Sequence, residues 1–433
     1  MDTETLPVAI GRADTAPSTG YGAIDRALRA RLIARMRGLR ESQLTLVDAL
    51  GETVLGQTVA GSADTLRATL RVHAATFYRA VATNGSVGAG EAYIDGDWEC
   101  DDPVALIRML VRNRDLLDAM ETGSARIGGM AMRAWHALRR NTRRGSRENI
   151  SAHYDLGNDF FRLFLDDNLM YSAAIFADAG ETLEAASTRK LDRICRKLAL
   201  SPADHVVEIG SGWGGFAIHA ATNFGCRVTT TTISQAQFDL ARERVRAAGV
   251  HDRVNVLLED YRDLSGRYDK LVSIEMIEAI GHQYLDAYFA KVGELLQPHG
   301  MALVQAITIE DHRYAQALRA VDFIKRHVFP GSFIPSISAM LGAAARRSDL
   351  KLFNLEDIGP SYAQTLAAWR ERFQRRRGEV HALGYDERFV RLWDFYLAYC
   401  EGGFRERSIG SVQMLLVKPD CRRPQYLPDI AAS

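Results

Sequence analysis

The sequence predicts an α/β protein whose main domain is a parallel, doubly wound sheet of seven strands. Three observations support this. Short apolar runs recur along the second part of the chain, helical patterns lie between most of them, and one run ends in an acid followed by alternating glycines. Alternation of strands and helices is typical of a parallel sheet with helices on both faces. The expected strands are residues 205–209, 227–232, 254–258, 269–274, 300–308, 350–355 and 411–417.

The first part of the chain has another pattern, which predicts a smaller α+β domain. Residues 1–20 mix Pro, Thr, Ser and Gly without periodicity and are expected to be disordered. Residues 24–40 predict an amphipathic helix, and residues 44–120 combine β-like runs such as 66–72 with a helix over 103–120. The expected units are a disordered N-terminus (1–20), an N-terminal domain (21–125), a basic linker (126–148), the main domain (149–420) and a tail (421–433).

The composition is that of an ordinary globular protein, with 47% hydrophobic and 25% charged residues in 433. Basic and acidic residues balance at 54 each, so the overall charge does not point to nucleic acid. The charge is nevertheless uneven, because seven arginines and no acid lie between Arg126 and Arg147. This basic segment is interpreted either as a solvated linker or as a region attracted to an anionic membrane surface.

Cysteine usage and apolar runs predict the compartment. The five cysteines are scattered without metal-ligand spacing, which indicates a reducing compartment and no metal site. The first residues lack the basic start and apolar core of a signal peptide, and no run of 18 apolar residues occurs. We therefore expect a cytoplasmic protein, associated peripherally with the inner face of the membrane. The oligomeric state stays open, a homodimer included.

The most informative segment is the glycine turn from Gly210 to Gly215 that follows the apolar run Val206–Ile209. A strand that ends in such a turn and starts a helix exposes backbone N–H groups to a ligand. The spacing also fits the dinucleotide fingerprint, but the run at 227–232 has no acid at its end to hold an NAD ribose. An acid instead precedes the glycines, at Glu208, which resembles motif I of class I S-adenosylmethionine (SAM) methyltransferases. A turn without any ligand is the remaining alternative.

Residues 311–348 are too long for an ordinary connection between strands. They are rich in aromatic and branched apolar residues in a setting broken by Pro and Gly. Such an insertion predicts a lid over the site or a wall of an apolar tunnel, and simple helix packing is an equal alternative.

Several ordered segments together resemble the cyclopropane-fatty-acyl-phospholipid synthase family, which includes the mycolic acid cyclopropane synthases. The likeness covers roughly residues 60–418. The segments that carry it are HYDLGNDFF at 153–161, MYS at 170–172, the glycine turn with Trp213, TISQAQ at 232–237, DYRD at 260–263, SIEMIE at 273–278, FPG at 329–331 and GEAYIDGDW at 90–98.

The resemblance implies a class I SAM-dependent methyltransferase domain, Rossmann-like and seven-stranded, with an N-terminal domain that engages lipid. SAM would donate a methyl group to the double bond of an acyl chain, a base would then remove a proton, and a cyclopropane ring would close. The residues that match SAM-binding positions, or form the turn, are Tyr171, Ser172, Glu208, Gly210, Gly212, Trp213, Gly214, Thr232, Gln237, Asp260 and Tyr261.

The family uses a bound bicarbonate ion as the base, and the resemblance implies three of its contacts here. Glu278 would accept a hydrogen bond from the ion, Tyr362 would donate one, and Ile307 would donate its backbone N–H. Cys400 matches a cysteine discussed as an active-site group in the family, although a buried structural thiol is the favoured alternative.

Three departures from the family pattern put the bicarbonate in doubt. Ala173 stands where the family has a cysteine, and Gln305 stands where it has a histidine. Glutamine donates hydrogen bonds but carries no charge. Glu275 stands where glycine is usual and is a candidate base or cation stabiliser. An N-capping or solvated glutamate is the alternative for Glu275.

The leading functional hypothesis is a lipid C-methyltransferase that acts on unsaturated acyl chains of membrane phospholipids, with cyclopropane fatty acid as its product. If the base is displaced, the same cation would end as a methyl-branched or exomethylene chain, and a diene is a further acceptor. A methyltransferase for a soluble small molecule and a lipid-binding protein without catalysis are the alternatives, since a fold alone does not fix the substrate.

Overall fold

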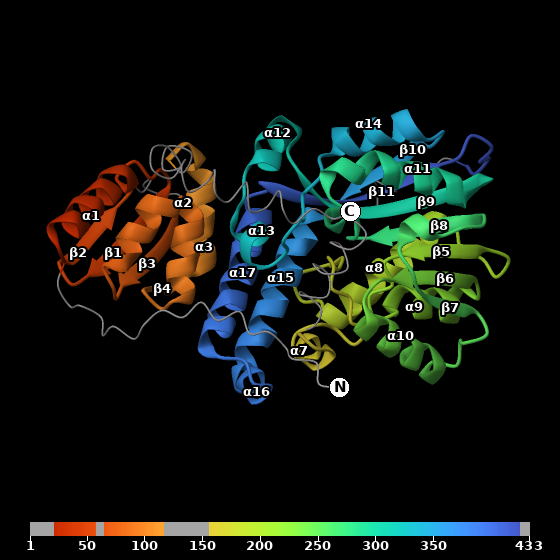
Figure 1. Cartoon of the computed structure of the whole chain (residues 1–433), viewed down its shortest axis with the longest axis horizontal. Coiled ribbons are helices and arrows are strands. Elements are labelled where there is room, and N and C mark those ends of the chain that lie inside the picture. The colour runs from red at the N-terminus through yellow and green to blue at the C-terminus, as the bar shows by residue number, and fades with distance from the viewer. Residues whose placement is uncertain (1–20, 58–64, 117–155, 425–433) are drawn as a thin grey trace, which may run out of the picture.

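The computed structural model describes residues 21–57, 65–116 and 156–424, and it contains two domains joined by helix packing (Figure 1). The predictions for residues 1–20, for the basic segment 126–148 and for the end of the tail fall outside these residues. Among the described residues, no helix is long and apolar enough to cross a membrane. No cluster of three or more metal-ligating side chains is found in the described ranges either.

In its described residues, the N-terminal domain is a four-stranded sheet with the helices α1, α2 and α3, as the α+β prediction requires. Its strand order is β2-β1-β3-β4, with β1 and β3 parallel and the other pairs antiparallel. The predicted helix over 24–40 is found as α1, whereas α3 is shorter than the expected 103–120. The elements are α1 (Ala23–Met36), β1 (Ser42–Asp48), β2 (Gly51–Leu55), β3 (Leu66–Val72), α2 (Thr76–Ile94), β4 (Trp98–Cys100) and α3 (Pro103–Arg112).

The second domain contains a seven-stranded sheet, and each of the seven predicted strands is confirmed. The strand order is β10-β11-β9-β8-β5-β6-β7. The strands are β5 (His205–Ile209), β6 (Arg227–Thr232), β7 (Val254–Leu258), β8 (Tyr268–Ile274), β9 (Leu296–Ile309), β10 (Lys351–Asp357) and β11 (Ile409–Val417).

The prediction that this sheet is wholly parallel is wrong at one strand. Strand β11 lies between β9 and β10 and runs antiparallel to both. The cause is the pair of long helices α15 (Gly359–Arg375) and α17 (Glu387–Arg405), joined by the short α16 (Arg377–Ala382), between β10 and β11. Two antiparallel helices return the chain to the end of the sheet where β10 finished, and β11 therefore runs back.

Side-chain alternation in the central strands supplies two hydrophobic cores, one on each face of the sheet. Val206 joins a core with helices α8, α9 and α10, whereas its neighbour Val207 joins a core with α11 and α14. The covering helices are α8 (Leu183–Leu198), α9 (Gly215–Phe224) and α10 (Gln235–Ala247) on one face, and α11 (Leu285–Leu295) and α14 (Ile337–Arg347) on the other.

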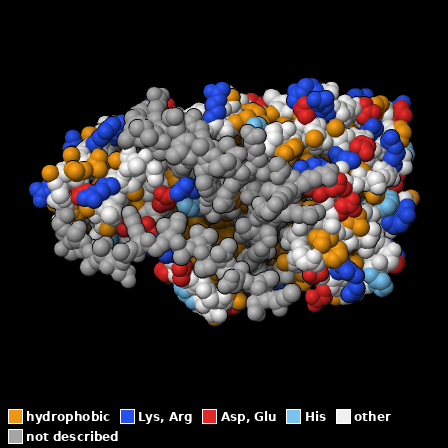
Figure 2. Space-filling model, viewed as in Figure 1, with side chains coloured by type: hydrophobic (Ala, Val, Ile, Leu, Met, Phe, Trp, Pro, Cys, Tyr) orange, Lys and Arg blue, Asp and Glu red, His pale blue; other side chains and the backbone are white. Residues whose placement is uncertain are grey.

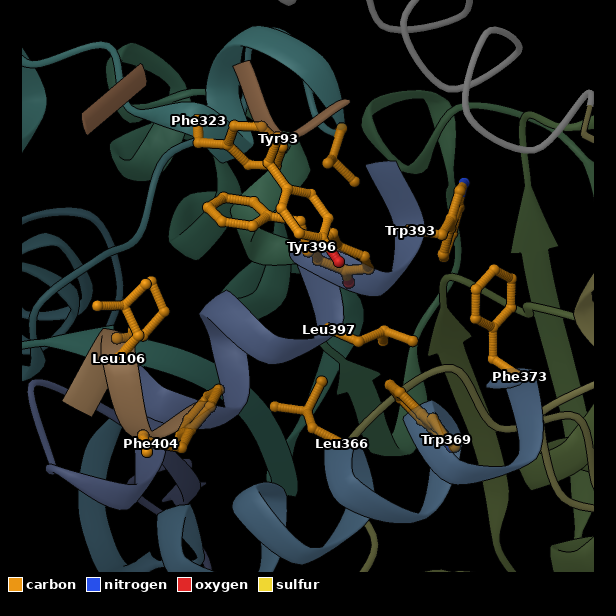
Figure 3. Packing of buried hydrophobic residues seen from close by; sticks show 14 of the residues in the cluster. Tyr93, Leu106, Phe323, Leu366, Trp369, Phe373, Trp393, Tyr396, Leu397 and Phe404 are labelled. Carbon is orange, nitrogen blue, oxygen red and sulfur yellow. The ribbon is translucent and has the colours of Figure 1, made fainter. Parts of the chain in front are cut away.

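Helix α17 connects the two domains, because it packs against α15 on one side and against α2 and α3 of the N-terminal domain on the other. Figure 1 shows both long helices between the N-terminal domain and the large sheet. Figure 3 shows the contact closely: Trp393, Tyr396 and Leu397 of α17 lie among side chains from both domains. The surrounding labelled residues are Tyr93, Leu106, Phe323, Leu366, Trp369, Phe373 and Phe404.

The segment 311–348 combines two of its predicted roles. It holds α12 (Asp311–Arg319) and α13 (Phe323–His327), and residues between 313 and 334 line the main cavity. The remaining helix, α14, packs on α11 and belongs to the core. Short helices η1 (Tyr261–Asp263), η2 (Ile277–Ala279) and η3 (His282–Tyr284) connect strands, and α7 (Asn158–Arg162) begins the described part of the second domain.

The close packing of α17 on α3 predicts the effect of a small substitution at Gly402. A Cβ atom at this position would lie 2.6 Å from Cγ2 of Ile107, closer than side-chain packing allows. We expect Gly402→Ala to lower the free energy of unfolding by about 1–3 kcal/mol, because the helices must separate. Gly378→Ala is the control: this residue lies in α16 with open space around it, and the change should be neutral or stabilising. Thermal unfolding of both variants checks this, and equal midpoints would contradict the packing.

Candidate active site

A cavity of about 790 Å³ opens beside the carboxyl ends of β5, β6, β8 and β9 and extends between the domains. It brings together nearly all of the candidate residues, although they come from segments far apart in the sequence. Those that line it are Tyr171, Ser172, Glu208, Gly210, Gly212, Trp213, Thr232, Gln237, Asp260, Tyr261, Glu275, Glu278, Ile307, Tyr362 and Cys400. Gly214 and Gln305 are not part of its lining.

The glycine turn forms one wall of the cavity through its backbone. Gly210 and Gly212 have φ angles of 95° and 50°, in the region that favours glycine, and no described atom lies within 4 Å of a Cβ built on Gly212. Gly214, also left-handed, is the N-cap of α9 and faces α10 rather than the cavity. The indole of Trp213 donates a hydrogen bond of 2.7 Å to Asn158 and closes the wall.

Glu208 is a buried carboxylate with an unsatisfied oxygen on the cavity wall. Its side chain is 2% exposed, and its Oε2 atom has no hydrogen-bond partner among the described residues. Burial raises the pKa of Glu208 to about 8, while the neighbouring Thr230 hydroxyl and then Lys190 oppose the shift. A buried carboxylate oxygen without a partner is costly unless a cation or a donor meets it. This position therefore fits a ligand that carries a positive charge.

Polar side chains after β6 and β7 form the opposite edge of the same part of the cavity. The Thr232 hydroxyl donates to Gln237 Oε1 at 2.8 Å, which leaves the amide N–H groups of Gln237 for a ligand. Asp260 is already held by Arg262, whose side chain contacts both carboxylate oxygens. The buried Tyr261 hydroxyl is unpartnered within the described ranges. An aromatic ring next to an acid suits a planar base that has donors at its edge.

The centre of the site is the Glu275 carboxylate, which accepts three hydrogen bonds. Its Oε1 atom accepts from the backbone N–H of Ala173 and from the side-chain amide of Gln305, each at 2.9 Å. Its Oε2 atom accepts from the Tyr362 hydroxyl at 2.7 Å. Burial raises the pKa of Glu275, and these three donors oppose that shift. Glu275 also has a φ angle of 49°, a conformation that non-glycine residues rarely adopt.

Gln305 is oriented by a buried polar chain behind the site. Gln413 on β11 donates to Gln305 Oε1 at 3.0 Å, and Lys197 donates to Gln413 Oε1 at 2.9 Å. Because the Gln305 oxygen is thus occupied, its amide nitrogen faces Glu275. Gln305 therefore acts behind the cavity wall as a positioning residue.

Glu278 is the second carboxylate of the cavity. Its Oε1 atom accepts a short hydrogen bond from the Ile307 backbone N–H, while its Oε2 atom has no partner among the described residues. Burial, and then the neighbouring Glu275, raise the pKa of Glu278 to about 8. Glu278 therefore holds a proton at neutral pH more readily than an ordinary glutamate. The Ile307 N–H and the Tyr362 hydroxyl, both expected to bind an ion, donate to protein carboxylates here.

Lys190 is a site residue that the sequence interpretation missed. It is fully buried on α8, and its ammonium group donates to the Ser172 hydroxyl at 2.8 Å. Burial lowers the pKa of Lys190 to about 8, opposed by Glu275 first among its acidic neighbours. Its spacing was a usable signal, since Lys190 lies four residues from both Ala186 and Ile194, which are buried core positions on the same helix face. Lys190 holds Ser172 and compensates the charge of the carboxylates.

Tyr171 and Cys400 lie on the more apolar side of the cavity. The Tyr171 hydroxyl shares a hydrogen bond of 2.9 Å with Tyr396 of α17, which ties the segment before α8 to the domain interface. Burial raises the pKa of the Cys400 thiol well above its usual range, so the sulfur stays protonated. A neutral buried thiol is a poor nucleophile, and Cys400 serves here as part of the wall.

The polar end of the cavity, which we call the polar cradle, is lined by Glu208, Thr232, Gln237, Asp260 and Tyr261. Together with the strand order and the glycine turn, it defines a SAM-dependent methyltransferase. Within this class, the family model described as mycolic acid cyclopropane synthetase matches residues 141–414, and the chain belongs to that family.

Two similar proteins align with most of the chain. The tuberculostearic acid methyltransferase UfaA1 of Mycobacterium tuberculosis is 37% identical over 370 residues, which are 83% of this chain and 86% of that protein. The cyclopropane-fatty-acyl-phospholipid synthase of Escherichia coli is 36% identical over 351 residues, 79% of this chain and 86% of its own. The solved structure of mycolic acid cyclopropane synthase CmaA1 with SAH and CTAB is 30% identical, has a TM-score of 0.59 and covers 63% of this chain and 98% of that one.

The residues present fit the methyl donor. SAM supplies an electrophilic methyl group on a sulfonium, and its amino acid part carries an ammonium group. A bound positive charge favours the ionised form of Glu208, so we expect the unpartnered Glu208 oxygen to meet the charged part of SAM. We expect the Gly210–Gly212 backbone to lie against the ligand. Tyr261 and Asp260 are the candidates for the adenine edge, and Thr232 with Gln237 for the polar groups between.

The raised pKa of Glu208 predicts a pH-dependent stability. The unfolded chain loses this proton near pH 4.5, whereas the folded chain keeps it until about pH 8, so the contribution of Glu208 to stability falls across that interval. Glu208→Gln cannot ionise, so its free energy of unfolding should not show this fall. Relative to the wild type, the free energy of unfolding of the variant should increase by about 1.4 kcal/mol per pH unit between about pH 5 and about pH 8. Thermal unfolding across that range measures the difference. A constant difference would mean that Glu208 is ionised in the folded protein.

Proposed function

We propose that this protein transfers a methyl group from SAM to a double bond in an acyl chain of a membrane phospholipid, with a cyclopropane fatty acid as the leading product. The observation that carries the proposal is the continuity of the cavity. One end is the polar cradle around Glu208, and the other end is apolar and reaches into the N-terminal domain. An apolar pocket of this size with few polar groups suits a long hydrocarbon chain.

The apolar part of the cavity has walls from both domains. On the side of the large sheet, Phe329, Leu366 and Tyr396 line it. On the N-terminal side, the lining comes from the small sheet and from α1, α2 and α3, and includes Leu32, Met36, Leu44, Leu46, Leu55, Leu70, Phe77, Val81, Leu106 and Ile107. Helix α2 also departs from helical geometry at Gly85, which lines the cavity. We infer that the N-terminal domain takes up part of the acyl chain.

Exclusion of water is what this architecture contributes to the chemistry. Attack of an alkene on the donor methyl places a positive charge on the acyl chain, and water would capture that cation. Aromatic walls such as Tyr171, Tyr396 and Phe329 keep the site dry and present ring faces, which attract cations. The carboxylates Glu275 and Glu278 are the acidic groups placed to stabilise the charge or to take a proton.

The product class follows from the fate of that cation. Loss of a proton from the added carbon with ring closure gives cyclopropane. A 1,2-hydride shift followed by loss of a proton from the added carbon gives an exomethylene chain, and a methyl branch further requires an external hydride donor that reduces this chain. Named relatives include both a tuberculostearic acid methyltransferase and a cyclopropane synthase. A methyl-branched or exomethylene product is therefore the second candidate.

We also propose that the protein acts at a membrane surface. On the face in Figure 2, basic and acidic side chains are interspersed over the described surface of both domains. The segment with excess positive charge is 126–147, and we propose that it attracts anionic lipid.

The function is tested with SAM and vesicles of monounsaturated phosphatidylethanolamine and phosphatidylglycerol. We expect acyl chains that gain one methylene unit by mass spectrometry, and NMR distinguishes ring protons from vinylidene protons. If no unsaturated lipid gained a methylene unit while a soluble acceptor was methylated, the proposal would be contradicted.

The inferred path of the acyl chain predicts a loss of turnover for a bulky residue in the N-terminal domain. Val81 is 8% exposed and lines the cavity, so Val81→Trp should lower turnover of long-chain lipid by roughly tenfold or more while SAM binding is unchanged. Val54→Trp is the matched control, because Val54 is 56% exposed on β2 of the same domain. Equal turnover of the two variants would place the acyl chain elsewhere.

A further inference from the structure

We propose that the Glu275 carboxylate is the base of the reaction and that the protein works without a bound bicarbonate ion. The inference rests on the proposed function, since it names the group that takes the proton from the methylated acyl chain. It follows from how the described residues use the hydrogen-bond donors of the site.

The donors that an anion would need are already used by Glu275. The Ala173 N–H, the Gln305 amide and the Tyr362 hydroxyl converge on its carboxylate from three different segments. Gln305 has no alternative orientation, because Gln413 holds its oxygen. Three donors that meet at one carboxylate on a cavity wall form an anion site that the protein fills with its own side chain.

The fourth and fifth groups expected at a bicarbonate site are engaged as well. The Ile307 N–H donates to Glu278, and Glu278 itself is a carboxylate beside Glu275. A further anion at this point would face two acids, and the four donors expected to bind it are already engaged within the described residues. The residues present therefore do not fit bicarbonate.

The backbone of Glu275 is strained, and hydrogen bonds around it hold the strained conformation. Its φ angle of 49° lies in the left-handed region, where a Cβ atom strains the chain and glycine is favoured. Backbone strain of this kind is typical of functional sites, where the surrounding structure holds it in place. Here the Glu275 N–H donates to the Gln305 carbonyl at 2.8 Å, which fixes the strained turn on β9.

The carboxylate has room for one proton. An ionised carboxylate offers about four lone-pair sites, and the three donors take two on Oε1 and one on Oε2. The remaining lone pair on Oε2 is available on the side of the cavity. Burial also raises the pKa of Glu275, and a carboxylate of raised pKa is a stronger base.

The reaction balances with this assignment. The π electrons of the alkene form a bond to the donor methyl carbon, and the carbon–sulfur bond breaks with its electron pair on sulfur. The positive charge passes to the acyl chain. Glu275 Oε2 then accepts a proton from the added carbon, and the freed C–H electron pair closes the ring. If a hydride first shifts from the methyl-bearing carbon to the neighbouring cationic carbon, the same proton loss forms an exomethylene double bond instead. The neutral Glu275 carboxyl afterwards releases the proton to solvent.

Three proteins test the inference: the wild type, Glu275→Gln and Glu275→Gly. Turnover on monounsaturated phospholipid vesicles is measured in buffer freed of carbon dioxide, and again with sodium bicarbonate or sodium formate at constant ionic strength. Thermal midpoints with SAH and increasing bicarbonate are measured in parallel without lipid, since an anion that binds the folded protein raises the midpoint. Midpoints without added anion verify that each variant is folded.

We expect wild-type turnover to be unaffected by bicarbonate. Glu275→Gln should lose about 100-fold or more in turnover without rescue, because the amide fills the space but accepts no proton. Glu275→Gly opens the anion site, so bicarbonate or formate should restore turnover by about tenfold and should raise the thermal midpoint. Bicarbonate should not shift the wild-type midpoint.

Three results would each overturn the inference: wild-type turnover that depends on bicarbonate, a Glu275→Gln variant that keeps its turnover, or a wild-type thermal midpoint raised by bicarbonate. Failure of the proposed function has a different signature, namely no turnover on any unsaturated lipid while the midpoints still separate wild type from Glu275→Gly.

Discussion

The site depends on one buried interaction, the convergence of three hydrogen-bond donors on the Glu275 carboxylate. Its donors come from the segment before α8, from β9 and from α15, so the carboxylate joins the sheet to the helix on which α17 packs. A buried carboxylate is expensive unless donors and opposite charge compensate it. Lys190, fully buried nearby, supplies the charge, and the polar chain from Lys197 through Gln413 fixes the Gln305 donor. Loss of any donor would destabilise the buried carboxylate and would loosen the segments that it holds together.

The domain arrangement serves the same site. Helix α17 packs against α15 on one side and against α2 and α3 on the other, so the apolar core of the interface continues into the cavity. Glycines at 90 and 402 let α2 and α17 approach the other domain closely. The cavity therefore has a charged end built on the sheet and a hydrocarbon end built largely on packed helices and the small sheet. This separation suits a reaction in which a cation forms on an acyl chain and must not meet water.

Much of the fold could be predicted from the sequence, because hydrophobic periodicity reports strands and helices directly. The seven strands and the glycine turn after β5 were predicted correctly. The direction of β11 was not, since it depends on how α15 and α17 return the chain, and no local pattern records that. The sequence marked Glu275, Gln305 and Ala173 as departures but did not indicate that they bond to one another. The spacing of Lys190 from buried positions on α8 could have marked it, but its acidic neighbours come from segments distant in the sequence, so its role in the site could not be predicted.

The most direct measurement of the central claim is an experimental structure of the protein with SAH, obtained in the presence of bicarbonate. The account predicts that Ala173, Gln305 and Tyr362 still donate to the Glu275 carboxylate and that no planar anion lies among them. A bicarbonate ion bonded to these three donors, with the Glu275 side chain turned away, would contradict it.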